Sequence, residues 1–380
     1  EEEALGNPQN ASVLVNSTVA KFECAYTNYA LLSGNVGDEL MVAGSFAVFF
    51  PYDQREVTPD LGGYATDDCE SEGGLYTPVS KARWLGDRTL DQIRQFPDDS
   101  VPDKTALLAE TAAYTGFSYN LFGQSWCRAA FDEGPAVQPA EALSRAEERF
   151  TTAIDLGTDA GLTDIVNASR VGRARARLLM GDGQGAVSDA EQVDSAFVMM
   201  ASRGTEDVTR ENKIYVLNNV QRRSPVGPDF WDATWKGEDD PRVPAVQTGR
   251  AGNDAVTPWV RQEKYTSLDA PIPIASWEEA QLIIAEVEGG DRAVEIINML
   301  HARADSLPAY DPQEDGPVQQ HLIQERAREL FLEGHRHYDM LRFGLPFPSG
   351  TQEWSGRSYG ETTCFPLPNA ETENNPEISS

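Results

Sequence analysis

Acidic side chains are the most numerous candidates for chemistry in this sequence, and two adjacent pairs stand out, Asp38-Glu39 and Asp67-Asp68. A glycosidase needs two carboxyl groups that flank the bond it cleaves. Adjacent acids in a loop are more often simply hydrated, and no serine or histidine stands in a nucleophile motif. The sequence therefore argues against an enzyme.

Metal binding is the second chemistry to consider. The histidines are His301, His321, His335 and His337, and no HExxH pattern occurs. His335 and His337 would lie about 200° apart on a helix, which does not suit a single metal ion. Zinc sites usually draw their ligands from close pairs, and no two cysteines are close in the sequence. We therefore expect no metal ion and no cofactor.

The cysteines indicate disulfide bonds instead. Cys24, Cys69, Cys127 and Cys364 are far apart and form no CxxC pair. Four scattered cysteines suit two long-range disulfides in an oxidising compartment, and three pairings can be drawn. Four buried free thiols are the alternative. The cysteines thus favour a location outside the cytoplasm.

The charge balance excludes several kinds of partner. The 380 residues include 61 Asp and Glu against 31 Lys and Arg, so the net charge is −30. Such a surface repels phosphate backbones and anionic lipids, which argues against nucleic-acid binding and electrostatic membrane docking. No apolar run is long enough to span a bilayer. The chain opens with three glutamates and shows no signal peptide, as expected of a mature form or an intracellular protein.

Helical hairpins interrupted by long loops are the predicted architecture. Ala146, Phe150 and Ala153 share one helix face, in the pattern of the second helix of a tetratricopeptide repeat. The glycine-rich stretch 181–185 lacks the lysine of a phosphate-binding loop and is predicted to be a turn. Irregular chain is predicted over 36–84, with at most a short strand pair, over 201–274 and from 344 onward. Helices are predicted at 8–34, 90–96, 104–122, 139–156, 163–180, 184–199, 276–288, 291–304 and 318–343.

The strongest motif is the segment ERARELFLEGHRHYDMLRFG, from Glu325 to Gly344. It resembles the hallmark of the SusD/RagB family of outer-membrane nutrient-binding lipoproteins, in which Glu-Arg, Glu-Leu and Glu-Gly-x-Arg are followed by Asp and a closing Arg. The matching positions are Glu325, Arg326, Glu329, Leu330, Glu333, Gly334, Arg336, Asp339 and Arg342.

Further matches follow one another along the chain. The segment 276–304 resembles the helix pair of the family, Asp240-Pro241-Arg242 matches a family tripeptide, and Lys264-Tyr265 stands where Lys-Tyr is common. The ending 364–376 is similar to the family's Pro-x-Pro, Glu and Asn-Pro pattern. The resemblance therefore extends over most of the chain.

The resemblance implies a mainly α fold in a single SusD-like domain over 1–380. This fold is an α/α superhelix of about four tetratricopeptide-type hairpins with long irregular insertions and minor β structure. It also implies a non-catalytic protein that captures oligosaccharide or another nutrient at the outer-membrane surface or outside the cell. The implied partner is a TonB-dependent (SusC-like) transporter, which the helical stack would face. The hairpins would be 104–156, 163–199, 276–304 and 318–343.

Aromatic residues of the two insertions are the candidate ligand contacts. A sugar stacks its C–H face on an aromatic ring, and its hydroxyl groups bond to polar side chains. Packing inside the protein is the alternative role of each residue, and no family motif identifies the ligand contacts. The candidates are Trp231, Trp235, Trp259 and Tyr265 from one insertion, and Tyr52, Tyr64 and Tyr76 from the other.

The charged residues of the C-terminal motif are expected to be structural. Residues three or four apart on a helix share a face, as Glu325 and Glu329 do. We expect Arg336, Asp339 and Arg342 to form a partly buried ion network with the irregular tail.

Two features depart from the family. The chain is shorter than most members, and its first cysteine, Cys24, falls inside a predicted helix, whereas the family carries a lipidated cysteine at its mature N-terminus. Either leading residues are absent here or the protein is not lipid-anchored. A second hypothesis is therefore an extracellular homo-oligomer of helical repeats that polymerises. The sequons at Asn10, Asn16 and Asn167 could carry covalent sugar in such a protein, and their chance occurrence on helices is the alternative.

Overall fold

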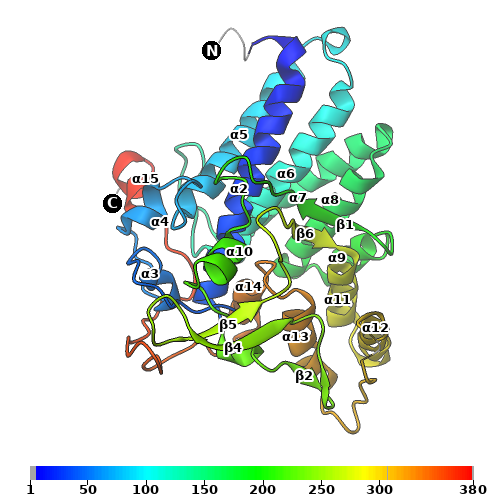
Figure 1. Cartoon of the computed structure of the whole chain (residues 1–380). Coiled ribbons are helices and arrows are strands. Elements are labelled where there is room, and N and C mark those ends of the chain that lie inside the picture. The colour runs from blue at the N-terminus through cyan, green and yellow to red at the C-terminus, as the bar shows by residue number, and fades with distance from the viewer. Residues whose placement is uncertain (1–5, 306, 379–380) are drawn as a thin grey trace.

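The computed structural model describes residues 6–305 and 307–378 (Figure 1). Helices dominate this part of the chain, so the predicted mainly α fold is confirmed. None of the described helices is both long and apolar enough to cross a lipid bilayer. The helices are α2 (Ala11–Val36), α3 (Phe50–Asp53), α4 (Gly62–Thr66), α5 (Tyr76–Gln95), α6 (Lys104–Ser125), α7 (Pro139–Asp159), α8 (Thr163–Met180), α9 (Gly183–Ala190), α10 (Lys213–Tyr215), α11 (Trp277–Glu288), α12 (Gly290–Arg303), α13 (Val318–Glu329), α14 (Arg336–Phe343) and α15 (Asn369–Asn374), with the short helical turns η1 (Pro8–Asn10), η2 (Asp98–Ser100), η3 (Val216–Val220) and η4 (Pro228–Phe230).

In the described part of the chain, strands form three separate two-stranded antiparallel sheets. The first sheet joins the two ends of the 201–274 insertion, because Val198 lies opposite Ser276 and Ala201 lies opposite Ile272. The insertion therefore leaves and re-enters the helical body at one place (Figure 1). The pairs are β1 (Val198–Ala201) with β6 (Ile272–Ser276), β2 (Thr234–Trp235) with β3 (Glu238–Asp239), and β4 (Ala245–Ala251) with β5 (Pro258–Gln262).

Helix α2 lies within the helical body, packed against α5 and α6 (Figure 1). All of its residues from Phe22 to Val36 are buried. A helix that is buried on every side belongs to the core and does not need a single apolar stripe. The short helices α3 and α10 and the helix α14 also contact α2 and help to bury it.

The small and large residues predicted to share a face of α7 pack closely. Phe150 is fully buried, and its ring lies against Gly116 of α6 and Gly172 of α8. A Cβ atom at Gly172 would come within 2.3 Å of that ring, so only glycine fits there. This close packing holds α6, α7 and α8 together as consecutive helices of a stack.

Several predicted boundaries were wrong. α5 begins at Tyr76, within the stretch predicted to be irregular, because Pro78 lies in its first turn, where proline is tolerated. The 36–84 stretch also contains α3 and α4 in place of a strand pair. α9 ends at Ala190, well before residue 199, and the chain then extends to pair with β6. The helix predicted over 318–343 breaks between α13 and α14, where Leu332 and Gly334 adopt left-handed backbone conformations.

Both predicted disulfides are present, and no free cysteine occurs in the described residues. Cys24 of α2 is bonded to Cys69, which attaches the loop before α5 to the core. Cys127, just after α6, is bonded to Cys364 in the C-terminal tail, 237 residues further along. A crosslink that closes such a long loop restricts the unfolded chain strongly. The tail is thereby tied to the helical body.

The C-terminal motif forms a buried ion network. The Arg326 side chain is 1% exposed and donates to the Asp339 carboxylate, which also accepts from Arg342 at 2.7 Å. Arg342 donates in addition to Glu286 of α11. Charges buried this deeply are tolerated because each is paired. The network joins α11, α13 and α14, so the prediction that it would reach the tail was wrong.

A second set of contacts joins the motif to the end of α2. Arg336 donates to both carboxylate oxygens of Asp38, at 2.7 and 2.6 Å. The neighbouring Glu39 accepts the backbone N–H of Leu332 at 2.7 Å. Burial raises the pKa of Glu39 to about 8, so this carboxyl group keeps its proton at neutral pH. Asp38 and Glu39, which we considered as possible catalytic carboxyl groups, therefore hold the end of α2 against the C-terminal motif.

Basic residues of the 201–274 insertion also form ion pairs with the C-terminal motif. Arg242 donates to Glu325 and Glu329 of α13. Lys264 donates to Glu333 at 2.6 Å. The family-like tripeptide, the Lys-Tyr pair and the C-terminal motif are remote in sequence, yet they meet in one cluster of paired charges.

We expect Arg336→Ala to lower the free energy of unfolding by about 1–3 kcal/mol, because Asp38 would lose its guanidinium partner in a largely buried position. Denaturant unfolding followed by circular dichroism measures this change. Arg292→Ala is the matched control, because among the described residues that arginine pairs with Glu288 and Glu295 at the surface. The control should cost less than about 1 kcal/mol. Wild-type stability in Arg336→Ala would contradict the structural role.

Candidate functional site

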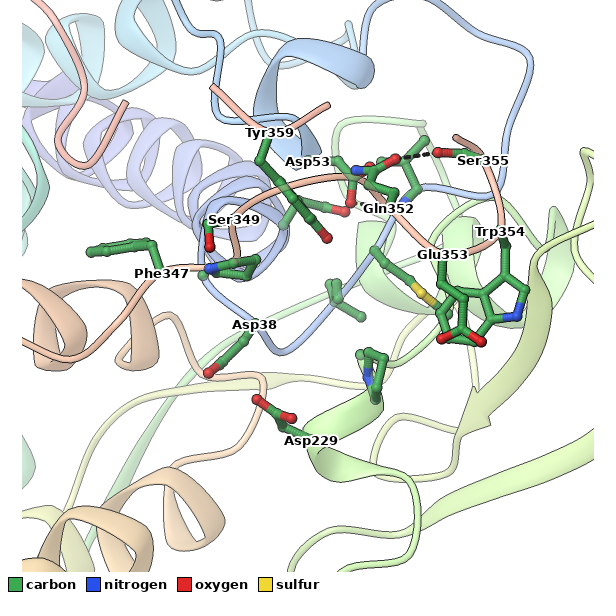
Figure 2. Close-up of a pocket in the computed structure, with 18 of the residues that line it drawn as sticks. Asp38, Asp53, Asp229, Phe347, Ser349, Gln352, Glu353, Trp354, Ser355 and Tyr359 are labelled. Atoms are coloured by element: carbon green, nitrogen blue, oxygen red, sulfur yellow. Dashed lines mark hydrogen bonds between the residues drawn. The ribbon is translucent and has the colours of Figure 1, made fainter. Parts of the chain in front are cut away.

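A cavity of about 370 Å³ lies between the end of α2, the turn η4 and the C-terminal tail. Its walls come mainly from residues 35–42, 227–229 and 346–359, which are remote in sequence. Figure 2 shows side chains from these segments gathered around a common space. A hollow of this size, with mixed apolar and polar walls, is typical of a small-ligand site.

Three aromatic side chains line the cavity, and all three come from the tail: Phe347, Trp354 and Tyr359. Each of them is only partly buried. Trp354 packs against Trp231 with 5.3 Å between the ring centroids, so a second indole supports it from behind. Partly exposed rings on a cavity wall offer flat apolar faces to a ligand.

Carboxylates occupy much of the remaining wall. Asp38 and Asp229 lie near each other in Figure 2, and Glu353 lies beside Trp354. Burial raises the pKa of Asp229, and the charge of Asp38 raises it further, whereas Arg336 opposes both effects. Among the described residues, no lysine or arginine lines the cavity. The site therefore presents hydrogen-bond acceptors and disfavours anionic ligands.

Asp53 holds the tail against the helical body at the edge of the cavity. Its carboxylate accepts the backbone N–H of Val42 at 3.0 Å and the side-chain amide of Gln352 at 2.6 Å. Ser355 in turn donates to the Gln352 oxygen (Figure 2). Burial raises the pKa of Asp53 to about 6, although both hydrogen bonds lower it. The ionised carboxylate thus positions the stretch that carries Trp354.

Backbone contacts secure the rest of the tail. Gly360 N–H donates to Gln54 O at 2.6 Å, and Thr362 N–H donates to Arg55 O at 3.0 Å. The Arg55 side chain also donates to Pro348 O at 3.0 Å. The sequence predicted only an irregular tail, and neither the disulfide expected of Cys364 nor the expected ion network indicated which tail residues would face a cavity. The cavity aromatics of the tail were missed for that reason.

Five of the aromatic residues proposed as ligand contacts lie in the core. The Tyr64 hydroxyl donates to Pro366 O, and the Trp259 indole donates to Asn218 O at 2.9 Å. Such internal hydrogen bonds are usual for buried tyrosine and tryptophan. The alternative role of packing accounts for the four tyrosines, whereas Trp259 also lines a separate cavity beside β4 and β5. The five are Tyr52, Tyr64, Tyr76, Trp259 and Tyr265.

The other two candidates are half-buried and differ in position. Trp231 donates from its indole to Val226 O at 2.7 Å and supports Trp354 beside the cavity. Trp235 donates to Pro308 O at 2.7 Å and packs against His321, away from the residues that line the cavity. The structure therefore brings one predicted residue, Trp231, next to the candidate site.

The second acidic pair has structural partners. Asp67 accepts from the Ser71 hydroxyl at 2.7 Å. Asp68 forms ion pairs with Lys81 at 2.7 Å and Lys21 at 3.5 Å. Neither acid lines the cavity. These contacts attach the loop that carries Cys69 to α2 and α5.

We expect Gln352→Ala to destabilise the fold by about 1–2 kcal/mol at pH 8, because the buried Asp53 carboxylate would lose a donor. At pH 5 most Asp53 carboxyl groups hold a proton in the folded protein, since the pKa is about 6, so the loss should be smaller. Urea unfolding at the two pH values measures the difference. Gln247→Ala is the control, because Gln247 bonds to Asp232 at the surface and its loss should cost little at either pH. An equal loss at both pH values for Gln352→Ala would contradict the role of Asp53.

Comparison with known proteins shows which proteins this chain resembles in sequence and in fold. Residues 279–380 match the SusD family. The starch-binding protein SusD of Bacteroides thetaiotaomicron is 34% identical over 122 residues, which cover 29% of this chain and 21% of that protein. A crystal structure of a SusD superfamily protein from Bacteroides vulgatus has a TM-score of 0.76 at 16% identity, with 98% of each chain covered. Surface glycan-binding protein A from Bacteroides thetaiotaomicron, solved in complex with laminarihexaose, has a TM-score of 0.73 at 14% identity and covers 96% of this chain and 98% of that chain.

The two kinds of likeness complement each other. The sequence match contains the motif of paired charges in α13 and α14, and the likeness in fold extends over nearly the whole chain. The resemblance that the sequence suggested is therefore confirmed: residues 279–380 match the SusD family, and nearly the whole chain has a SusD-like fold.

Proposed function

We propose that this protein captures a glycan, or another small nutrient, in the cavity between α2 and the tail, without converting it chemically. The observation that carries the proposal is the set of three partly exposed rings, Phe347, Trp354 and Tyr359, in a wall that also bears carboxylates and amides. Rings of this kind hold the apolar face of a sugar, while the polar groups bond to its hydroxyls.

The descriptions of the relatives support a carbohydrate ligand. One relative is a starch-binding protein and another was solved with laminarihexaose. The sequence match to SusD spans only about a fifth of that protein, so its own ligand is not transferred to this chain. Starch and laminarin fragments are therefore the first compounds to test.

The charge of the site favours an uncharged ligand. The described lining contains Asp38, Asp53, Asp229 and Glu353 and no basic side chain, and the whole chain has a net charge of −30. An acidic glycan would meet repulsion both at a distance and inside the cavity. Neutral oligosaccharides can use the same carboxylates as hydrogen-bond acceptors for their hydroxyl groups.

We also propose where the protein acts and which partner it serves. The whole chain would act as one SusD-like domain at the outer-membrane surface or outside the cell and pass its ligand to a TonB-dependent (SusC-like) transporter. The family resemblance supports the partner, and the two disulfides support an oxidising location. The helical stack would face the transporter, and the cavity would face the ligand.

We expect Trp354→Ala to weaken binding of the wild-type ligand about tenfold, because one stacked ring contributes on the order of 1 kcal/mol. A glycan array that includes laminarihexaose and starch fragments would first identify the ligand, and calorimetry would then give the two dissociation constants. Trp84→Ala is the matched control, since Trp84 is a 50% exposed tryptophan of α5 outside the cavity.

Three outcomes would count against the proposal. Unchanged affinity in Trp354→Ala would exclude this cavity as the binding site. Failure of the wild type to bind any glycan or small nutrient in the screen would exclude the function. Shorter sugars that appear during incubation of the ligand with purified protein would contradict a non-catalytic role.

A further inference from the structure

A cluster of three buried side chains lies apart from the cavity, where α12 meets α13. It consists of His301 from α12 and of His321 and Glu325, one turn apart on α13. Their exposed fractions are 1%, 6% and 0%. One potential ligand atom from each residue lies within 4.8 Å of the other two. None of the three lines the candidate glycan cavity.

The hydrogen bonds of His301 indicate that a cation belongs in this cluster. Its Nδ1 atom is 2.8 Å from Pro308 O, and a carbonyl oxygen only accepts, so Nδ1 carries the proton. In a neutral imidazole, Nε2 is then an acceptor, yet it lies 3.0 Å from Oε2 of Glu325, which is also an acceptor. Two acceptors at this distance need either a shared proton or a metal ion between them.

His321 favours the metal ion. Its Nε2 atom is buried, and its one contact with a polar side-chain atom among the described residues is a long one, 3.5 Å from the same Glu325 oxygen. A second proton on His301 would leave this nitrogen with that weak contact alone, whereas a shared ion would use all three atoms. Zinc binds histidine nitrogen and carboxylate oxygen at about 2.0–2.2 Å in a tetrahedron, whose edges are then about 3.3 Å. The separations of 3.0 and 3.5 Å agree with such edges.

The surroundings hold the three donors in place. The other oxygen of Glu325 accepts from Arg242, and Asp240 and Glu329 also pair with that guanidinium, so its charge is offset nearby. The Tyr310 ring stacks on His321 at 4.2 Å between centroids. The Nδ1–H bond of His301 to a backbone carbonyl is the outer contact that metal-bound histidines usually make. The donors are thus oriented by other groups before any ion binds.

We propose that His301, His321 and Glu325 form a binding site for one zinc-type divalent cation that joins α12 to α13, with water as the fourth ligand. No close pair of metal ligands stands in the sequence, and we therefore expected no metal. The fold brings together residues 301 and 321, which lie on different helices. The nitrogen-rich donor set favours zinc over calcium, which binds oxygen ligands.

The test begins with the wild-type full chain, stripped of metal with a chelator. Zinc is titrated in the presence of a chromophoric chelator, which suppresses weak binding to surface carboxylates. Cobalt is titrated separately, because its visible absorption distinguishes four-coordinate from six-coordinate ions. We expect one ion per chain, a four-coordinate cobalt spectrum and a rise in melting temperature with added zinc.

A pair of variants assigns the ligands. His321→Phe keeps a ring to stack on Tyr310 but removes the nitrogen. We expect it to lower zinc affinity at least about 100-fold, because loss of a group that only orients a ligand already costs up to about that much. Gln324→Ala is the control, because Gln324 is an exposed residue of the same helix and supplies no ligand atom. It should keep most of the affinity.

Two results would overturn the site. A wild-type chain that takes up no zinc against the chelator would show that a proton lies between His301 and Glu325. Equal zinc binding by the wild type and His321→Phe would place the ion elsewhere. The wild-type titration decides the first point even if a variant fails to fold, and neither result bears on glycan binding in the cavity.

Discussion

Burial of paired charges beneath the C-terminal motif is the constraint on which the rest of this structure depends. Arg326, Asp339 and Arg342 are held inside the protein by one another and by Glu286, while Arg336 reaches across to Asp38 at the end of α2. A charge in such a position is costly unless its partner is in place. The helices that carry the partners therefore have little freedom to move apart. Because Asp38 also lines the cavity, the packing of the motif fixes one wall of the candidate site.

The sequence predicted those parts of the molecule that depend on local pattern. Helical spacing located α2, α6, α7, α8, α11 and α12, and scattered cysteines indicated two disulfides. Short motifs that match a family identified the fold, although they did not say which partners each charge would choose. The ion network was expected to reach the tail, and it joins α2 and α11 instead. Pairing of this kind is decided by tertiary distance, which residue spacing along a chain does not contain.

Ligand contacts were harder to predict than the fold, and the aromatic residues show why. Tyr64 and Trp354 are both large, partly polar aromatic residues in loop-rich segments, yet one is fully buried and the other lines a cavity. The residue type shows that a ring can stack on a sugar, but it does not show whether the ring is exposed in the folded protein. The same limit applies to His301 and His321, which are separated by a turn and a loop and meet only in three dimensions. Sites assembled from remote segments carry no local signature.

The tail that bears Phe347, Trp354 and Tyr359 is crosslinked to the body by the Cys127–Cys364 bond. Reduction of this bond would leave the aromatic wall attached to the body by noncovalent contacts alone, such as those of Asp53 with Gln352 and of Arg55 with Pro348. The covalent bond therefore limits how far the two sides of the candidate cavity can separate, whichever ligand lies between them.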